Sequence, residues 1–443
     1  MACIKWSTPL MIVSLVFVTR TACGTPIKWN DQAKWERAVK NVLDFFDDHA
    51  WDSHSYASEL DEKGNLTSDV RQIVALARMI YANAKAPKQH QNLHRARQTA
   101  EFLLRNMLTK DEVGILFRSS VNAKGEAPTG MDARSYVFIF EQAYPIAGLV
   151  ALYSADPKAN ADLLSTIRHA AESFWNRFWD STHGGLFYYY NLSKKDHSND
   201  QGQVHKSYQS TIYPISSFLL ALRNADVEVR SRYDHWINKL LDVAMAQLIE
   251  KEDGQMTGWL RERTLPDFSI DPSYVMSEAG HITQLSWVMG EAVKQQIVKE
   301  PAKRALYRKT VETLLTKFIR HGGISPTLGC VYDAFDRTSG LPLRDDKGRT
   351  TTAWWSNLEA IIAYSFALRH RWLGDLTTAE VERTLDGLAN CYFSYFVDTK
   401  YGGEYFRINA QTGAVVDSTK GNGGKSGYHI TEAYQALFGS LAM

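Results

Sequence analysis

The feature that most constrains this sequence is an alternation between two kinds of helical segment from residue 30 onward. One kind is amphipathic and rich in Arg, Lys and Glu, as in residues 89–107. The other kind is apolar nearly all round, as in residues 212–222 and 360–368. A helix that is apolar on every face must be buried on every face. The alternation therefore predicts inner helices surrounded by outer helices.

The helical period recurs often enough to predict an all-α fold, an (α/α)6 barrel of six inner and six outer helices. The motif around Tyr144 recurs in outline around Tyr213, one helical pair further along, as expected of a repeating unit. Glycine pairs mark short β-hairpin loops, which we expect to wall a pocket at one end of the barrel. The expected helices span 30–49, 68–85, 89–107, 134–153, 157–179, 207–223, 229–250, 278–296, 301–320, 351–370, 377–395 and 427–441.

Residues 1–22 have the features of a secretory signal peptide. Lys5 precedes a short apolar run at 10–18, which is too short to span a bilayer, and a small-residue exit ends at Ala22. We therefore expect cleavage near Ala22, export to the periplasm or the cell exterior, and one catalytic domain over residues 23–443. A lipid anchor at Cys23 is the alternative, although Arg20 lies where such signals prefer an apolar residue.

Composition narrows the class of partner. The 443 residues carry a net charge of +1, which gives no reason to expect nucleic acid or an acidic membrane surface. The 12 Trp, 21 Tyr and 19 Phe suit a pocket that stacks against a small sugar, although aromatic residues also fill cores. Cys330 and Cys391 could form one disulfide or remain two thiols, and no zinc-binding spacing occurs. We expect no metal and no cofactor, and a monomer or a homodimer.

Two histidines occupy similar positions. His281 follows Gly280 at the start of an apolar helix, and His429 follows Gly427 and Tyr428 at the start of another. The positive end of a helix dipole should lower the pKa of His281 and keep its imidazole neutral and able to accept a proton. A lone histidine here would more often be structural. Two at separate inner-helix starts could face each other across the pocket, as proton transfer at a carbon requires.

Other residues near the inner-helix starts are candidates for binding a sugar. Arg71 and Arg78 are seven residues apart, hence on one face of the predicted second helix, and either could contact substrate oxygens or pair with a core carboxylate. Trp355 and Glu359 combine a stacking platform with a carboxylate on the same face. Trp259, on a predicted loop before His281, is a further stacking candidate.

These motifs resemble those of the N-acylglucosamine 2-epimerase superfamily, which includes cellobiose 2-epimerases and mannose isomerases. The resemblance covers almost the whole mature chain, and the motifs that carry it are short. They are Gly280-His281 with Trp287, Trp354-Trp355-Ser356-Asn357-Leu358-Glu359, Tyr428-His429, and Arg78 within Ala77-Arg78-Met79-Ile80-Tyr81.

The resemblance implies a sugar 2-epimerase or an aldose–ketose isomerase that works through an enediolate. By that resemblance His281 and His429 are the acid/base pair, Arg78 steadies the carbonyl oxygen, and Trp355 and Glu359 shape the sugar site. The sequence departs from the family pattern at five positions, which places Tyr213 and Gln284 among the expected substrate-binding residues. The departures are Gln284 for a glutamate, Tyr213 with Ser216 for a histidine and a glutamate, Glu432 for an arginine and Phe140 for a tyrosine.

Two alternatives stay open at the level of sequence. An exported glycoside hydrolase on the same barrel would need two carboxylates roughly 5–10 Å apart, with Asp69, Glu278 and Glu359 as candidates. A carbohydrate-binding protein that has lost catalysis is the other alternative, which the amide of Gln284 favours. Facing histidines would support the isomerase or epimerase, opposed carboxylates the hydrolase, and a collapsed pocket the binding protein.

Overall fold

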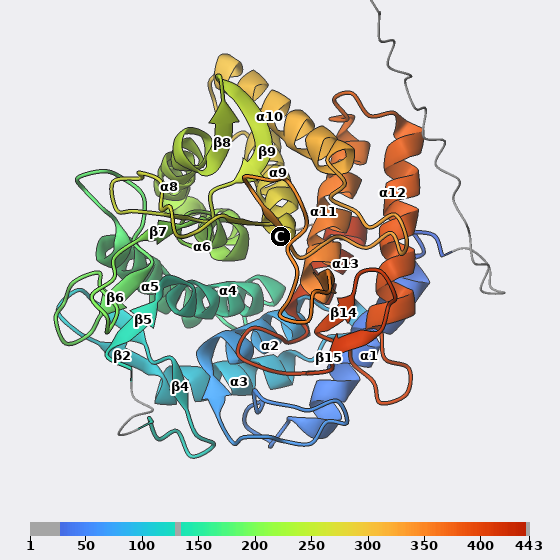
Figure 1. The fold of residues 1–443 in the computed structure, drawn as a ribbon. Coiled ribbons are helices and arrows are strands. Elements are labelled where there is room, and N and C mark those ends of the chain that lie inside the picture. Colours follow the sequence, from blue (N-terminus) through green and yellow to red (C-terminus); the bar gives the residue numbers. More distant parts are fainter. Residues whose placement is uncertain (1–26, 129–133, 440–443) are drawn as a thin grey trace, which may run out of the picture.

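The computed structural model describes residues 27–128 and 134–439, in which the helices form a ring within a ring (Figure 1). Short π-helical turns interrupt or end some of them, namely η3 (Ile215–Leu219), η5 (Ala244–Leu248) and η6 (Tyr392–Phe396). The α-helices of the described residues are α1 (Gln32–His49), α2 (Ile73–Lys85), α3 (Leu93–Asn106), α4 (Ile139–Ala155), α5 (Leu163–Phe178), α6 (Tyr208–Pro214), α7 (Leu220–Ala225), α8 (Arg230–Val243), α9 (Ala279–Lys294), α10 (Pro301–Arg320), α11 (Trp354–His370), α12 (Thr378–Cys391) and α13 (Tyr428–Phe438).

The inner ring closes on itself. Helix α2 packs against α4, α4 against α6 and α7, α6 against α9, α9 against α11, α11 against α13, and α13 back against α2. Each inner helix also packs against an outer one, and α1, α3, α5, α8, α10 and α12 surround the ring (Figure 1). The predicted (α/α)6 barrel is therefore confirmed. None of the helices in the described ranges combines the length and the apolar character needed to cross a membrane.

Burial follows the sequence pattern. In α4 every residue from Ile139 to Leu152 is buried except Phe140, which is partly buried. In the outer helix α3 only Ala96, Thr99, Ala100, Phe102 and Leu103 are buried. The apolar helices thus form the core of the barrel, and the amphipathic helices cover it with one face each.

Short strands precede most inner helices. Strand β1 leads directly into α2, β5 into α4, β7 into α6, β11 into α9 and β13 into α11. The expected helix starts at residues 68 and 134 are therefore wrong, because residues 71–72 and 136–138 pair with neighbouring strands before α2 and α4 begin. The strands are β1 (Arg71–Gln72), β2 (Leu108–Lys110), β3 (Ile115–Phe117), β4 (Ser120–Val121), β5 (Tyr136–Phe138), β6 (Tyr189–Asn191), β7 (Lys206–Ser207), β8 (Ile249–Glu252), β9 (Gln255–Leu260), β10 (Arg263–Thr264), β11 (Met276–Glu278), β12 (Ala334–Asp336), β13 (Thr351–Ala353), β14 (Arg407–Asn409) and β15 (Val415–Asp417).

Two of the glycine-pair loops share one construction. After α5, the buried ammonium of Lys206 donates to Asp180 Oδ2 at 2.6 Å and to the Gly184 carbonyl oxygen at 2.6 Å. After η6, Lys420 donates in the same way to Asp398 at 2.8 Å and to the carbonyl oxygen of the first glycine of that loop at 2.9 Å. Each buried lysine therefore holds a hairpin loop at the end of the barrel where the inner helices begin.

Cys330 and Cys391 form a disulfide with a Cα–Cα distance of 5.4 Å, which decides between the two states left open by the sequence. The bond joins the chain between α10 and α11 to the last residue of the outer helix α12. The expected signal peptide at 1–22 and the alternative lipid anchor at Cys23 lie outside the described residues.

Candidate active site

A cavity of about 530 Å³ lies where the inner helices begin. The first residues of α2, α4, α11 and α13 and the side chains of α6 contribute to its walls. This is the end at which the hairpin loops were expected to wall a pocket. Its lining includes Gln72, Arg78, Arg134, Phe138, Phe140, Glu141, Tyr144, Gln209, Tyr213, Glu278, Trp354, Trp355, Phe406, Gly424 and His429.

His429, the second residue of α13, lines this cavity. Its Nδ1 lies 3.3 Å from Glu359 Oε1 and 3.5 Å from Glu432 Oε2. Burial lowers the pKa of His429 to about 4 and, together with Arg78, outweighs the opposing effect of Glu432. Burial also raises the pKa of Glu359 to about 7 and raises that of Glu432. At neutral pH the imidazole of His429 is therefore neutral, the form that can accept a proton.

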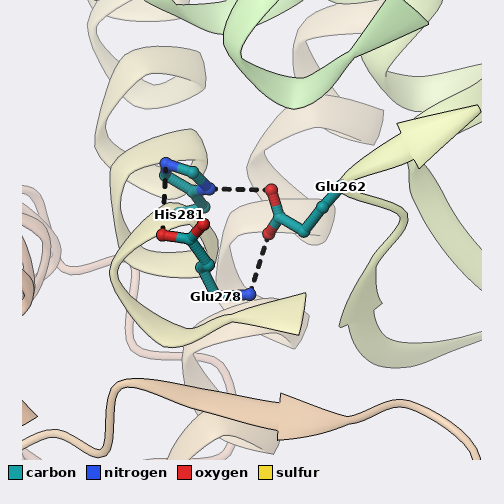
Figure 2. A group of neighbouring side chains, drawn as sticks. All are labelled: Glu262, Glu278 and His281. Atoms are coloured by element: carbon teal, nitrogen blue, oxygen red, sulfur yellow. Dashed lines mark hydrogen bonds and ion pairs between the residues drawn. The ribbon is translucent and has the colours of Figure 1, made fainter. Parts of the chain in front are cut away.

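His281 is held between two acidic residues, Glu262 and Glu278 (Figure 2), and it also contacts a tyrosine. Its Nδ1 contacts Glu262 Oε2 at 2.7 Å, and the other oxygen of Glu262 accepts the backbone N–H of Glu278 at 2.9 Å. Its Nε2 lies 3.0 Å from the Tyr213 hydroxyl and 3.9 Å from Glu278 Oε2. Tyr213 and Glu278 line the cavity, whereas the imidazole of His281, at 1% exposure, lies behind them.

The expected neutral state of His281 is wrong. Burial opposes its charge, but Glu262 and Glu278 outweigh burial and raise the pKa of His281 to about 8. A carboxylate at 2.7 Å acts more strongly on the ring than the partial charge of a helix end. Sequence reasoning missed Glu262 because it lies just past β9, on a segment whose contact with α9 depends on the fold.

The Trp355 ring lies close to both histidines. Its ring centroid lies 5.3 Å from that of His281 and 6.1 Å from that of His429, and its side chain lines the cavity. A Cβ atom on Gly280 would lie 2.3 Å from the Trp355 ring, so the glycine before His281 is needed for this approach. The structure thus brings together both histidines and the predicted stacking platform.

Arg78 supplies positive charge to the cavity. Its Nη2 donates to the Tyr144 hydroxyl at 2.8 Å, and its Nη1 donates to the Gly424 carbonyl oxygen. The guanidinium also lies over the Tyr144 ring, 4.2 Å from the centroid. Within residues 27–128 and 134–439 no carboxylate forms an ion pair with it, and its Nε has no hydrogen-bond partner. The positive charge of Arg78 is therefore available to interact with an oxygen atom of a ligand in the cavity.

Two predicted binding residues lie elsewhere. Arg71 belongs to β1 rather than to α2, so the predicted face shared with Arg78 is wrong, and its guanidinium instead binds Asp52 and Ser55. Trp259 lies in β9 rather than on a loop, with its ring 4.8 Å from that of Phe335, and is buried outside the cavity. Both side chains have structural partners that do not line the site.

Gln284 and Glu359 lie behind the cavity wall. Gln284 Nε2 donates to Glu359 Oε1 at 3.0 Å, and Gln284 Oε1 accepts from the Tyr208 hydroxyl at 3.2 Å. Trp287 Nε1 donates to the other oxygen of Glu359 at 2.7 Å. Neither Gln284 nor Glu359 lines the cavity, so neither is placed for the expected direct contact with substrate. Their side chains instead form hydrogen bonds behind the residues of the cavity wall.

Two side-chain groups could in principle hold a divalent cation, since each brings a histidine and two carboxylates within 4.8 Å of one another. In the first group both ring nitrogens of His281 already have partners, and in the second both oxygens of Glu359 accept hydrogen bonds. At least one residue of each group thus already uses its ligand atoms in hydrogen bonds. The groups are Glu262, Glu278 and His281, and Glu359, His429 and Glu432.

Comparisons with known proteins agree with this architecture. The family model described as N-acylglucosamine 2-epimerase (GlcNAc 2-epimerase) matches residues 55–433. The structure of cellobiose 2-epimerase from Bacillus thermoamylovorans B4167 is 14% identical, with a TM-score of 0.74 over 91% of this chain and 98% of that chain. A D-mannose isomerase structure is 15% identical, with a TM-score of 0.75 over 92% of this chain and 98% of that chain. The GH76 α-mannanase of Bacteroides thetaiotaomicron is 14% identical, with a TM-score of 0.61 over 93% and 96%.

At these identities the solved structures establish the fold. No curated protein sequence matches the chain.

Proposed function

Since the chain belongs to the N-acylglucosamine 2-epimerase family, a family of carbohydrate epimerases and isomerases, we propose that it moves a proton at C2 of a small reducing sugar. One observation carries this proposal. A neutral imidazole, that of His429, and an uncompensated guanidinium, that of Arg78, line the same cavity beside the Trp355 ring. A base, a positive charge and a stacking surface are the groups that enolisation of a sugar needs.

The proposed reaction begins with the open-chain sugar against Trp355. His429 removes the proton from C2, which is acidic because it adjoins the C1 carbonyl. The electron pair of the C2–H bond forms the C1–C2 double bond, and negative charge develops on O1. Arg78 stabilises this charge, because a preorganised cation in a buried site interacts with it strongly.

The fate of the proton decides the product. Its return by His429 to C1 on the same face gives the ketose, as O1 gains a proton and O2 loses its proton to become the C2 carbonyl oxygen. Proton delivery to the opposite face of C2 gives the 2-epimer. Of the two histidines, only His429 lines the cavity, since Tyr213 and Glu278 separate His281 from it. This arrangement favours the one-base route, so we propose aldose–ketose isomerisation as the principal activity.

The test is proton exchange in heavy water. The purified protein is incubated with mannose, glucose, N-acetylmannosamine or cellobiose, and NMR follows both the C2 proton and the products. We expect exchange with at least one sugar, and a loss of at least about 10²-fold in His429→Gln. His370→Gln, at the opposite end of α11, is the matched control and should keep full activity. A folded wild-type protein that exchanges no C2 proton with any sugar would overturn the proposal.

The geometry gives the hydrolase alternative little support. Asp69 is exposed and Glu359 lies behind the wall, so of the three candidate carboxylates only Glu278 lines the cavity. The other carboxylate in the lining, Glu141, is paired with Arg134 at 2.6 Å and accepts the backbone N–H of Phe138 at 2.9 Å. A protein that only binds sugars would show saturable binding without exchange in the same NMR experiment.

We also propose that the protein is exported. The disulfide between Cys330 and Cys391 supports this, because structural disulfides persist mainly in oxidising compartments. Expression of the full chain followed by N-terminal sequencing of the exported product should find a start near residue 23. Full-length protein retained in the cytosol would contradict export.

A further inference from the structure

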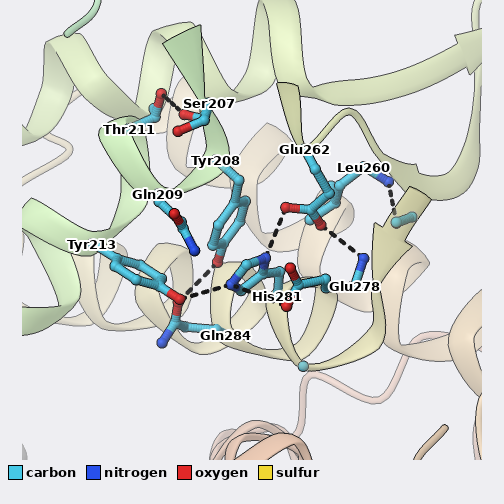
Figure 3. Close-up of polar contacts among 12 residues, drawn as sticks. Ser207, Tyr208, Gln209, Thr211, Tyr213, Leu260, Glu262, Glu278, His281 and Gln284 are labelled. Carbon is cyan, nitrogen blue, oxygen red and sulfur yellow. Dashed lines mark hydrogen bonds and ion pairs between the residues drawn. The ribbon is translucent and has the colours of Figure 1, made fainter. Parts of the chain in front are cut away.

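Three side chains form a continuous chain of hydrogen bonds that ends at the cavity (Figure 3). Glu262 Oε2 contacts His281 Nδ1 at 2.7 Å, and His281 Nε2 contacts the Tyr213 hydroxyl at 3.0 Å. Glu262 and His281 are 5% and 1% exposed, whereas Tyr213 lines the cavity. The chain therefore runs from a buried carboxylate through a buried imidazole to a phenol that substrate can reach.

The charge of His281 fixes the direction of these hydrogen bonds. The titratable groups that face it are Glu262 beside β10, Glu278 at the end of β11, Tyr208 and Tyr213 of α6, and Glu359 of α11. Burial opposes the imidazolium, but the carboxylates raise the pKa of His281 to about 8, so both ring N–H groups are donors at neutral pH. Nδ1–H then donates to Glu262 and Nε2–H donates to the Tyr213 oxygen.

Tyr213 consequently has its own proton to donate. Among the described residues, His281 is the only hydrogen-bond partner of the Tyr213 hydroxyl, so its O–H is left for a group in the cavity. The Tyr213 ring lies edge-on to that of Tyr144, 6.1 Å between centroids, and Tyr144 accepts from Arg78. The phenol and the guanidinium thus adjoin the same part of the cavity, where the proposed function places O1.

Local structure holds Tyr213 in this position. Pro214 and the π-helical turn η3 follow it, and the Ser217 hydroxyl donates to its backbone carbonyl oxygen at 2.6 Å. Departures from regular α-helix of this kind often occur at functional sites. The Tyr213 side chain lines the cavity, whereas the imidazole of His281 does not, because the Tyr213 hydroxyl lies between the two.

We propose that Tyr213 is a catalytic residue: it donates a proton to the substrate carbonyl oxygen and regains one from His281. As His429 takes the C2 proton, the Tyr213 O–H bond breaks and an O1–H bond forms. At the same time the His281 Nε2–H bond breaks and a new Tyr213 O–H bond forms, which leaves His281 neutral and the substrate an enediol. When the ketose forms, His429 returns its proton to C1 and the O2–H bond breaks as the C2 carbonyl forms. Tyr213 accepts the O2 proton and passes its own proton back to His281, which is thereby recharged. This assignment rests on the proposed function, in which His429 is the base, and it names Tyr213 as the acid.

The first variant is Tyr213→Phe, which removes only the hydroxyl. We expect kcat to fall by at least about 10²-fold, the usual contribution of a positioned acid. In the wild type kcat should fall as pH rises past about 8, where His281 loses its proton, and this basic limb should disappear in Tyr213→Phe. Tyr364→Phe is the matched control, because Tyr364 is another buried inner-helix tyrosine that donates one hydrogen bond, to the Leu315 carbonyl oxygen. It should keep the wild-type pH profile.

A purely structural role for Tyr213 would lower kcat at every pH and leave the basic limb in place. That result, or a Tyr213→Phe variant within about threefold of wild type, would overturn the assignment. Glu262→Gln provides a second route should Tyr213→Phe fail to fold. Loss of the carboxylate charge should move the basic limb to lower pH, and an unmoved limb would contradict the relay. Absence of wild-type exchange with every sugar is a different outcome, since it overturns the proposed function itself.

Discussion

His281 and His429 show how strongly side-chain contacts override sequence context. Each lies in the first turn of an apolar inner helix, so the helix dipole acts similarly on both. The pKa of His281 is nevertheless raised to about 8, and that of His429 is lowered to about 4. Glu262 on one ring, and burial with Arg78 beside the other, account for the difference. Environments that separate the pKa values of two groups assign one as acid and the other as base.

This separation predicts a bell-shaped dependence of kcat/KM on pH. His429 must be neutral to accept a proton, so activity should fall as pH drops through about 4. His281 must be protonated to supply one, so activity should fall as pH rises through about 8. Initial rates of product formation from about pH 3.5 to about pH 9.5 give both limbs. The protein should first be shown to stay folded over this range. A single limb near the ordinary histidine pKa of 6.5 would contradict the assignment.

At the residue scale the sequence predicts the groups that a helix start presents, but not their partners. His281, His429 and Trp355 lie close together because each belongs to the first turn of an inner helix, and Arg78 reaches the same cavity from the middle of α2. Glu262 escapes such reasoning, because its contact with His281 joins two segments whose approach depends on the closed barrel. Arg71 and Trp259 do not line the cavity, because each lies in a short strand in which its side chain contacts other residues.

At the scale of the element, α9 shows why an inner helix contains glycines. A Cβ atom on Gly280 would lie 2.3 Å from the ring of Trp355, and one on Gly290 would lie 2.3 Å from the ring of Phe366. Both positions therefore allow α9 to approach α11 closely. Only the first approach shapes the cavity, because Trp355 lines it and Phe366 does not.

Alanine at these two positions separates packing from function. Gly280→Ala should destabilise by about 1–3 kcal/mol through overpacking, offset by up to about 1 kcal/mol of helix propensity, and should raise KM because Trp355 must move. Gly290→Ala, the matched control, should destabilise to a similar extent with KM unchanged. Urea unfolding and steady-state kinetics measure the two effects. Equal changes in KM would show that Trp355 does not contact substrate.

The hairpin loops give a second prediction at this scale. Lys206→Met leaves the buried Asp180 carboxylate without its charge partner and should destabilise by about 3–5 kcal/mol. The double variant Lys206→Met with Asp180→Asn should recover part of this loss, because no buried charge remains. Lys40→Met, which breaks an exposed pair with Asp44, should change stability by less than about 1 kcal/mol. Chemical unfolding of the wild type and these three variants tests the pairing, and a double variant no more stable than Lys206→Met would contradict it.

The sequence predicts the type of each main element correctly, but the first residues of some helices less accurately. Apolar helices of period 3.6 are readily recognised, so all the expected helices are present in the described chain. The predicted starts of α2 and α4 are more than one turn too early, because the residues of β1 and β5 pair with other strands instead of continuing the helix. Pairing partners distant in sequence cannot be read from a local period.

At the scale of the whole molecule, the closed ring follows from composition of the inner helices. A helix buried on all faces needs neighbours on both sides, and a ring supplies them without an edge. The shape of the cavity follows from details that no period encodes, such as the partly buried Phe140 at the start of α4 and the position of Trp355 over Gly280. The sequence thus predicts the barrel and the end that carries the site, while the structure defines its lining.

The disulfide is the one covalent link across this architecture, among the described residues, and its removal gives a prediction for the whole molecule. Cys330 and Cys391 are 61 residues apart, and closing a loop of this size stabilises by about 4 kcal/mol in the chain-entropy account. Cys330→Ser with Cys391→Ser should therefore lower Tm clearly, and reductant should lower the Tm of the wild type to the same value. Reductant should leave the Tm of the double variant unchanged.

Activity should respond differently from stability. Neither cysteine lines the cavity, so the double variant should keep kcat within about threefold at temperatures where it is folded. One connection could transmit the change: Val331, next to Cys330, donates its N–H to Asn357 Oδ1 at 2.9 Å, and Asn357 lies two residues after Trp355 in α11. Because that hydrogen bond does not need the disulfide, KM should also hold. A rise in KM at a temperature where the double variant is fully folded would instead show that the disulfide positions Trp355. Asn357→Ala should then raise KM to the same extent in the protein with the disulfide intact.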